Sequence, residues 1–132
     1  MRSSGILLDT HALIWWLFDD PKLSPAAREA VCDPRHEILV SSVSAWEVAT
    51  KHRLGKLPEA GDLPDRFQHY VATARFRELP VTIAHALAAG RLPGPHKDPF
   101  DRMLIAQALG ERLSVVTVDP VFASYGATVI WR

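Results

Sequence analysis

The sequence predicts an α/β fold in which a parallel β-sheet is flanked by helices. Short apolar runs alternate along the chain with longer segments whose apolar residues recur at helical spacing, which is typical of this class. The predicted strands are separated by helices, and this favours parallel pairing. The 132 residues contain no internal repeat or low-complexity linker, and their 48% hydrophobic content is enough for one domain with its own core.

Five segments are predicted as strands because their apolar or β-branched residues form short continuous runs. In chain order they are Ile6–Leu8, Ile38–Ser41, Leu79–Val81, Ser114–Val118 and Thr128–Trp131. The first is apolar throughout, as expected of a strand buried on both faces. The last is predicted to be an edge strand.

Helices are predicted between the strands from apolar spacing and from residues that start or stop a helix. The predicted helices cover residues 10–18, 25–32, 42–54 (capped by Ser42 or Ser44), 64–75, 82–90 (capped by Thr82) and 100–109. Ser24 and Pro25 are typical of an N-cap and a first helical position. Gly55 and Gly110 lie where two helices are predicted to end. Residues 91–97 are rich in Pro and Gly and are predicted as a loop beside the next helix start.

Charge and cysteine content restrict the class of protein. Lys and Arg balance Asp and Glu at 15 each, so a nucleic-acid binder would need a local basic patch or a metal that offsets its acidic groups. Cys32 is the only cysteine, so the chain cannot form an internal disulfide, which suits a reducing compartment. The N-terminal segment lacks a signal-peptide pattern, and the apolar stretch 6–18 is too short and polar to span a bilayer. We expect a cytoplasmic protein.

Four carboxylates lie at the ends of apolar segments. Asp9 and Asp119 each follow a predicted strand, whereas Glu47 and Asp101 lie near the starts of two helices. Strand ends and nearby helix starts share one edge of an α/β sheet, where ligands bind. Carboxylates gathered there resist desolvation unless a cation joins them, so at least one should have a raised pKa without metal. A hard divalent ion such as Mg²⁺ or Mn²⁺, and with it phosphate chemistry, is the simplest explanation.

Each acid also has a local structural explanation. Asp9 could cap the following helix, and Asp119 could begin a turn. The segment 44–47 has the spacing of a capping box, and local sequence alone favours that interpretation of its glutamate. Asp98 has the features of an N-cap, with Pro99 as the first helical residue. Asp101 lies on the turn above and is the better candidate for a metal ligand.

Four further residues are candidates for supporting roles. Lys97 and Arg102 would flank a phosphate bound beside the acids. His96 could donate a proton or simply be a solvated loop residue. Thr117 could orient a carboxylate or a bound water through its hydroxyl, or merely favour the strand.

The first predicted helix carries more apolar side chains than one buried stripe can hold. They are Leu13, Trp15, Trp16, Leu17 and Phe18. Some of them should be exposed on the isolated chain and receive a partner.

Four segments in order resemble the PIN-domain family, and closely the VapC-type toxin ribonucleases. They are residues 7–11 (Leu-Leu-Asp-Thr-His), 44–47 (Ser-Ala-Trp-Glu), 96–102 (His-Lys-Asp-Pro-Phe-Asp-Arg) and 116–119 (Val-Thr-Val-Asp). The resemblance spans nearly the whole chain and implies one domain, residues 1–132, with a Rossmann-like sheet. It implies that Asp9, Glu47, Asp101 and Asp119 hold Mg²⁺ or Mn²⁺ and cleave RNA, so it favours a metal role for Glu47 over a capping box. It also implies a cognate antitoxin and a homodimer.

The expected function is a metal-dependent endoribonuclease toxin neutralised by its antitoxin. One alternative is a PIN-like RNA- or protein-binding module that is catalytically weak. Another is an acid-cluster phosphotransferase, such as a haloacid-dehalogenase-like phosphatase or a receiver domain. Such a phosphatase would need a second aspartate two residues after Asp9, where His11 stands.

Overall fold

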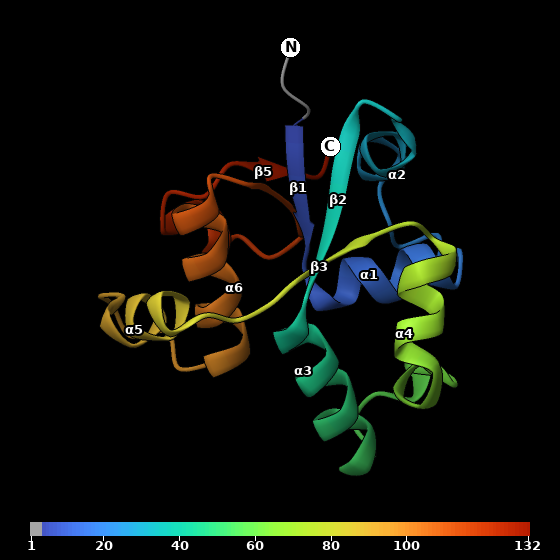
Figure 1. The fold of residues 1–132 in the computed structure, drawn as a ribbon, viewed down its shortest axis with the longest axis horizontal. Helices are drawn as coiled ribbons and strands as arrows, with labels where there is room; N and C mark the ends of the chain where they lie inside the picture. Colours follow the sequence, from blue (N-terminus) through green and yellow to red (C-terminus); the bar gives the residue numbers. More distant parts are fainter. Residues whose placement is uncertain (1–3) are drawn as a thin grey trace.

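A five-stranded parallel sheet forms the centre of the computed structural model, which describes residues 4–132 (Figure 1). The strands are β1 (Ser4–Leu8), β2 (His36–Ser41), β3 (Arg77–Leu79), β4 (Ser114–Val116) and β5 (Val129–Ile130). Their order across the sheet is β3-β2-β1-β4-β5, and every neighbouring pair is parallel. The predicted fold class is therefore confirmed.

Helices cover both faces of the sheet. They are α1 (Thr10–Leu17), α2 (Pro25–Cys32), α3 (Ser42–Arg53), α4 (Leu63–Thr73), α5 (Ile83–Arg91), α6 (Pro99–Glu111) and α7 (Val121–Ser124), with a 3-10 turn at Pro58–Ala60. In Figure 1, α1, α2 and α4 lie on one side of the sheet, and α5 and α6 lie on the other. Among the described residues, no helix combines the length and the apolar character needed to cross a membrane.

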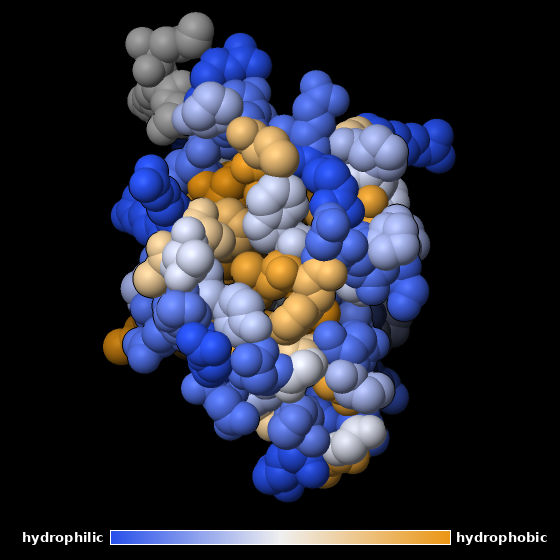
Figure 2. All heavy atoms as spheres, turned by 90° about the vertical axis from the view of Figure 1, so that its right-hand side faces the viewer, coloured by the Kyte–Doolittle hydropathy of each residue, from blue (hydrophilic) through white to orange (hydrophobic). Residues whose placement is uncertain are grey.

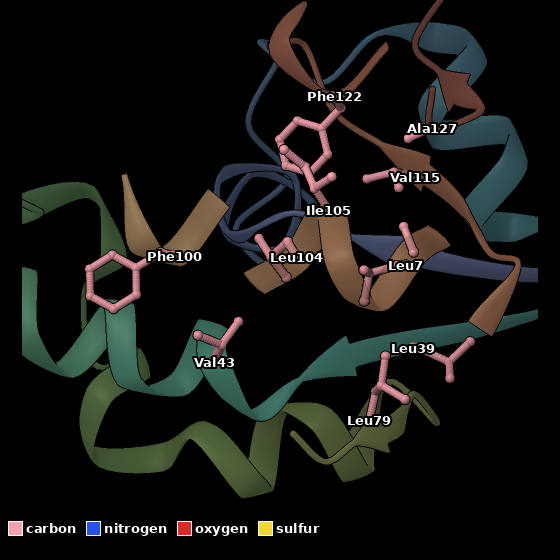
Figure 3. Packing of buried hydrophobic residues seen from close by; sticks show 11 residues of the cluster. Leu7, Leu39, Val43, Leu79, Phe100, Leu104, Ile105, Val115, Phe122 and Ala127 are labelled. Carbon is pink, nitrogen blue, oxygen red and sulfur yellow. The ribbon is translucent and has the colours of Figure 1, made fainter. Parts of the chain in front are cut away.

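The core has two main parts because successive side chains of a strand point to opposite faces. Leu7 of β1 packs on the α6 side with Leu104 and Ile105, as Figure 3 shows. Ile6 and Leu8 pack on the opposite side, against α1 and α2. All five side chains are buried, so residues 6–8 of β1 are apolar at each position for a physical reason: both faces of the strand are covered there.

The helix starts follow the predicted capping residues in most cases. Ser24 caps α2 with Pro25 in the first turn, Thr82 caps α5, and Asp98 caps α6. The prediction for α3 was wrong, because its N-cap is Ser41, whose Oγ accepts a hydrogen bond from the Val43 N–H (3.0 Å).

Several boundaries differ from the predictions by a few residues, and three of these differences have a local reason. The strand expected at 79–81 is Arg77–Leu79, since Pro80 has no N–H to extend the ladder. Strand β4 ends at Val116 and not at residue 118, because the Thr117 hydroxyl accepts a hydrogen bond from the Asp119 N–H and turns the chain. Helix α6 continues through Gly110 to Glu111, and its C-cap residue Arg112 adopts a left-handed conformation. The α7 turn and the 3-10 turn were not predicted.

The sheet order places the ends of two central strands side by side. Strand β1 is flanked by β2 and β4, so the order of strands reverses at β1 and leaves a switch point between β1 and β4. In open α/β sheets, ligands bind beyond the carboxyl ends of the strands at such a point. Asp9 directly follows β1, and its N–H donates to the carbonyl of Val116 at the end of β4 (3.2 Å).

Candidate functional site

An acidic cavity of about 470 Å³ opens at this edge of the sheet. It lies between the start of α1, one face of α3, the start of α6 and the segment that follows β4. Five carboxylates line it: Asp9, Glu47, Asp98, Asp101 and Asp119. The structure thus brings the four predicted acids to one cavity, together with Asp98.

Asp9 is the most deeply buried aspartate of the group. It caps α1 as its local sequence indicates, because Oδ1 accepts a hydrogen bond from the Ala12 N–H (2.7 Å). Burial raises the pKa of Asp9 from 3.8 to about 6, although hydrogen bonds from Thr117 and Ala12 oppose the rise. Capping and a site role therefore coexist in one side chain: the cap engages Oδ1, and the carboxyl group still lines the cavity.

Glu47 is buried on α3 and reaches across to α1. Its Oε1 accepts a hydrogen bond from the Thr10 hydroxyl (2.6 Å), and Oε2 pairs with the ammonium of Lys51. The Oγ of Ser44 lies 3.0 Å from the Thr10 Oγ1 and so joins the same group. The capping-box interpretation of Glu47 was wrong, since the N-cap of α3 is Ser41 and not Ser44.

Lys51 and Thr10 belong to the site but were not among the predicted site residues. Lys51 lines the cavity one helical turn after Glu47 and also lies over the ring of Phe100 (5.8 Å to the centroid). Burial opposes its charge, yet Glu47, Asp98 and Asp101 together raise the pKa of Lys51. The sequence carried the signal as a glutamate followed four residues later by a lysine, a spacing that places both on one helix face.

Asp98 caps α6 as predicted, and both Asp98 and Asp101 line the cavity. The Oδ1 of Asp98 accepts hydrogen bonds from the N–H groups of Phe100 (2.9 Å) and Asp101 (3.3 Å). Asp101 approaches His96, whose Nε2 lies 3.1 Å from Oδ2. Burial and then the charge of Asp98 raise the pKa of Asp101, with smaller contributions from Asp119 and Glu47. The expected rise in pKa is therefore found at Asp9 and Asp101.

Thr117 links the two strand ends. Its hydroxyl accepts from the Asp119 N–H (3.0 Å) and also hydrogen-bonds the carboxyl group of Asp9. Asp119 in turn accepts from the Val121 N–H through Oδ1 (3.0 Å), which is the turn that its local sequence suggested. Because Thr117 is buried, it holds Asp9 and Asp119 in fixed relation.

None of the four predicted supporting residues lines the acidic cavity; Thr117 and His96 contact its carboxylates, whereas Arg102 and Lys97 have other surroundings. The guanidinium of Arg102 donates to the backbone carbonyls of Ala89, Leu92 and His96, so it fastens the loop 92–97. Arg102 was predicted to contact a phosphate, but its guanidinium is instead hydrogen-bonded to backbone carbonyls of the loop. Lys97 is exposed and lines a neighbouring cavity.

The apolar first helix is only partly exposed. Leu13 is fully buried, Trp15 and Trp16 are half-buried, and Phe18 is 38% exposed. Trp15 lines the acidic cavity and packs beside Trp131 (5.8 Å between ring centroids). Greater apolar exposure is found on other helices, at Trp46, Ile83 and Leu87.

The chemistry of the cavity suits a hard cation, although its side chains are not arranged around one. Among residues 4–132, no three His, Cys, Asp or Glu side chains lie close enough together to hold an ion jointly. The carboxylate oxygens are nonetheless the ligands that Mg²⁺ and Mn²⁺ prefer. The pKa values of Asp9 and Asp101 are raised chiefly by burial, and neighbouring carboxylates add to the rise.

Comparisons with known proteins agree with this architecture. Residues 6–127 match the model of the PIN domain family. The chain is 41% identical over 68 residues to ribonuclease VapC16 of Mycobacterium tuberculosis, a match that covers 48% of this chain and 44% of VapC16. It is 29% identical over 115 residues to ribonuclease VapC22 of the same organism, which covers 86% of each protein.

Solved structures show the same fold at low sequence identity. VapBC2 from Rickettsia felis, bound to a promoter DNA fragment, matches with a TM-score of 0.66 and 14% identity, over 95% of this chain and 96% of that chain. FitAcB from Neisseria gonorrhoeae matches with a TM-score of 0.60 and 21% identity, over 94% and 95%. The family match covers nearly the whole chain, and the fold agrees with it. The chain belongs to the PIN domain family.

Proposed function

We propose that the protein is a metal-dependent endoribonuclease and the toxin of a toxin–antitoxin pair. Its proposed metal ligands and catalytic residues are Asp9, Glu47, Asp101 and Asp119. The observation that carries the proposal is the gathering of these acids in one cavity at the switch point of the sheet. Membership of the PIN domain family and similarity to two proteins named as ribonucleases support the same activity.

The carboxylates are proposed to hold Mg²⁺ or Mn²⁺. When bound, such an ion polarises a phosphate and lowers the pKa of an attacking water. Thr117 would keep Asp9 and Asp119 in place, because its hydroxyl contacts both segments. Thr10 would hold Glu47, and Lys51 would either share that carboxylate with the ion or move aside.

His96 is proposed to move a proton at the edge of the cavity. Its Nε2 is within hydrogen-bonding distance of Asp101 Oδ2, and the ring is half-buried. An imidazole ring can donate a proton from one nitrogen and accept one at the other, so His96 can give a proton to a leaving oxygen or take one from a water. Single-stranded RNA, or the loop of a folded RNA, is the proposed substrate because an unpaired backbone can enter a narrow edge cavity.

Cleavage of RNA in the presence and absence of divalent metal tests the proposal. The wild-type protein should cut single-stranded RNA with Mg²⁺ or Mn²⁺ and should lose cutting in a chelator. Asp9→Asn should abolish it, because Asn preserves the helix cap but not the anionic ligand. Asp65→Asn is the matched control, since Asp65 is exposed on α4 outside the cavity. RNA binding without cutting under all of these conditions would instead favour a binding module.

An antitoxin is the proposed protein partner. The solved structures with this fold include VapBC2, FitAcB and a toxin–antitoxin complex from Klebsiella pneumoniae. Figure 2 shows apolar side chains gathered in the middle of the face that carries α1, α2 and α4, with hydrophilic residues around them. A groove of about 450 Å³ is lined in part by Phe67, Val71 and Phe76.

We propose that an antitoxin segment covers apolar surface of this kind and sends a basic side chain, such as Arg, to the acidic cavity. An arginine pairs strongly with carboxylates and would compete there with the metal. The homodimer implied by the family resemblance is a separate proposal, and the exposed Ile83 and Leu87 of α5 are candidates for its contact.

A further inference from the structure

A second cavity of about 790 Å³ adjoins the acidic cavity and is larger than it. Its lining comes from the loop 92–97 and from Val121, Ser124 and Tyr125. None of these residues has a place in the metal chemistry proposed above except His96.

The two cavities share a thin wall. Lys97 lines the second cavity and Asp98 lines the acidic one, and the same division falls between Val121 and Pro120. Consecutive Cα atoms are only about 3.8 Å apart, so one residue of backbone separates the two spaces on each side. His96 joins them directly, since it lines the second cavity and its Nε2 contacts Asp101 in the first.

The wall of the second cavity is held in place by specific contacts. Arg102 donates from Nε to the Ala89 carbonyl (3.2 Å) and from Nη1 to the His96 carbonyl (3.0 Å), and it also donates to the carbonyl of Leu92. These bonds fasten both ends of the loop. Gly94 has a φ of +89°, and a Cβ there would lie 2.8 Å from the Tyr125 hydroxyl, so only glycine permits this close approach of loop and ring.

The chemistry of the lining suits an unpaired nucleobase. Tyr125 and His96 present aromatic rings, and aromatic side chains stack on bases of any sequence. Lys97 supplies a positive charge at the rim, where an RNA backbone would pass, and Ser124 offers a hydroxyl to a base edge. The lining combines apolar side chains such as Leu92 and Val121 with polar ones, so a flat ring with a polar edge fits it better than a fully apolar side chain.

We propose that this second cavity binds the nucleobase next to the scissile phosphate, with Tyr125 as its stacking platform. The inference rests on the proposed ribonuclease activity, because it assigns the neighbouring nucleotide of the same RNA. The cleaved phosphate would lie over the acidic cavity, and the strand would then cross the ridge at 97–98 and 120–121. Arg102 acts as a positioning residue that keeps the loop wall of the base pocket in place.

An abasic scan of a short single-stranded RNA tests the proposal through binding alone. Each nucleotide is replaced in turn by an abasic one, and the affinity is measured by fluorescence anisotropy without metal. One position should weaken binding to the wild type roughly tenfold, as expected when one base loses its aromatic platform. Tyr125→Leu should weaken binding of the intact RNA by a similar factor. The abasic substitution at that one position should then cause no further loss of affinity in the variant. Tyr125→Phe keeps the ring and should behave like the wild type.

The outcomes separate this inference from the ribonuclease assignment. If the wild type cuts RNA, but the fold-loss of affinity from Tyr125→Leu multiplies with that of every abasic position, then Tyr125 and the tested bases act independently. The base pocket is then refuted and the nuclease assignment stands. If the abasic position and Tyr125→Leu are coupled but no RNA is cut, the pocket stands and the nuclease fails. Absence of any RNA binding overturns both.

Photocross-linking keeps the proposal open to refutation if Tyr125→Leu does not fold. RNA carrying 5-iodouridine at successive positions should attach to Tyr125 or His96 of the wild-type protein at a single position. Attachment only to residues outside the second cavity would overturn the proposal, as would attachment of an antitoxin peptide there with no attachment of RNA.

Discussion

Asp9→Asn should stabilise the metal-free protein at neutral pH while it removes activity. The pKa of Asp9 is raised from 3.8 to about 6, chiefly by burial, so the folded state disfavours the ionised carboxylate. At 1.36 kcal/mol per pKa unit, this rise corresponds to about 3 kcal/mol of free energy of unfolding lost once Asp9 is ionised. Asn removes the charge and keeps an oxygen for the Ala12 N–H, so the helix cap survives.

The sign of the pH dependence follows from the raised pKa. Below about pH 4 the carboxyl group is protonated in both states, so the wild type and Asp9→Asn should be equally stable with respect to this group. Between about pH 4 and 6 the unfolded state releases its proton first, so the wild type loses stability as the pH rises. Above about pH 6 the difference should stay constant at about 3 kcal/mol.

Urea denaturation followed by circular dichroism across this pH range measures the difference. Mn²⁺ should reduce it, because an ion bound to the acids compensates their charge only in the wild type. Asp65→Asn should change stability little at any pH. A variant that is no more stable than the wild type at about pH 8, or a difference that does not vary with pH, would refute the reasoning.

Three further predictions test the neighbouring groups. Asp98→Asn should keep most RNA cleavage, because Asn also caps helices, whereas Asp101→Asn should lose most of it; equal losses would show that the assignment within this pair is wrong. Lys51→Met should lower the free energy of unfolding without metal by about 2 kcal/mol, because it leaves the buried Glu47 carboxylate unpaired, and an unchanged urea midpoint would contradict this. Arg102→Lys should raise KM for RNA several-fold with kcat nearly unchanged and should speed proteolysis of the loop 92–97; a loss confined to kcat would place Arg102 in the chemistry instead.

Most of the fold could be predicted from the sequence because local signals agreed with the tertiary arrangement. Strand β1 carries apolar side chains on both faces. The caps at Ser24, Thr82 and Asp98 are hydrogen bonds to N–H groups two or three residues ahead, so they depend little on the rest of the fold. The prediction that acids at strand ends share one cavity needed only the general geometry of parallel sheets. The structure confirms that gathering, while the catalytic and metal-binding roles remain proposals.

The remaining features depend on contacts between residues far apart in the chain. Glu47 fits a capping box locally, and its burial against Thr10, 37 positions away, cannot be inferred from spacing. Arg102 stands beside an acid in the sequence, yet its side chain turns to the loop carbonyls at Ala89 and His96. The early end of β4 reflects competition between the Thr117 hydroxyl and the strand ladder, which propensity alone does not resolve.

Direct measurement of Mn²⁺ binding, by electron paramagnetic resonance of the free ion, tests the central claim that the acidic cavity is a metal site for RNA cleavage. The wild type and Asp65→Asn should bind Mn²⁺ with the same affinity, and that affinity should match the Mn²⁺ concentration that gives half-maximal RNA cleavage. Asp9→Asn and Asp119→Asn should both weaken binding at least tenfold and abolish cleavage in parallel. Mn²⁺ binding that is unchanged by these two substitutions, or RNA cleavage that persists in the wild type after the metal is removed, would contradict the account.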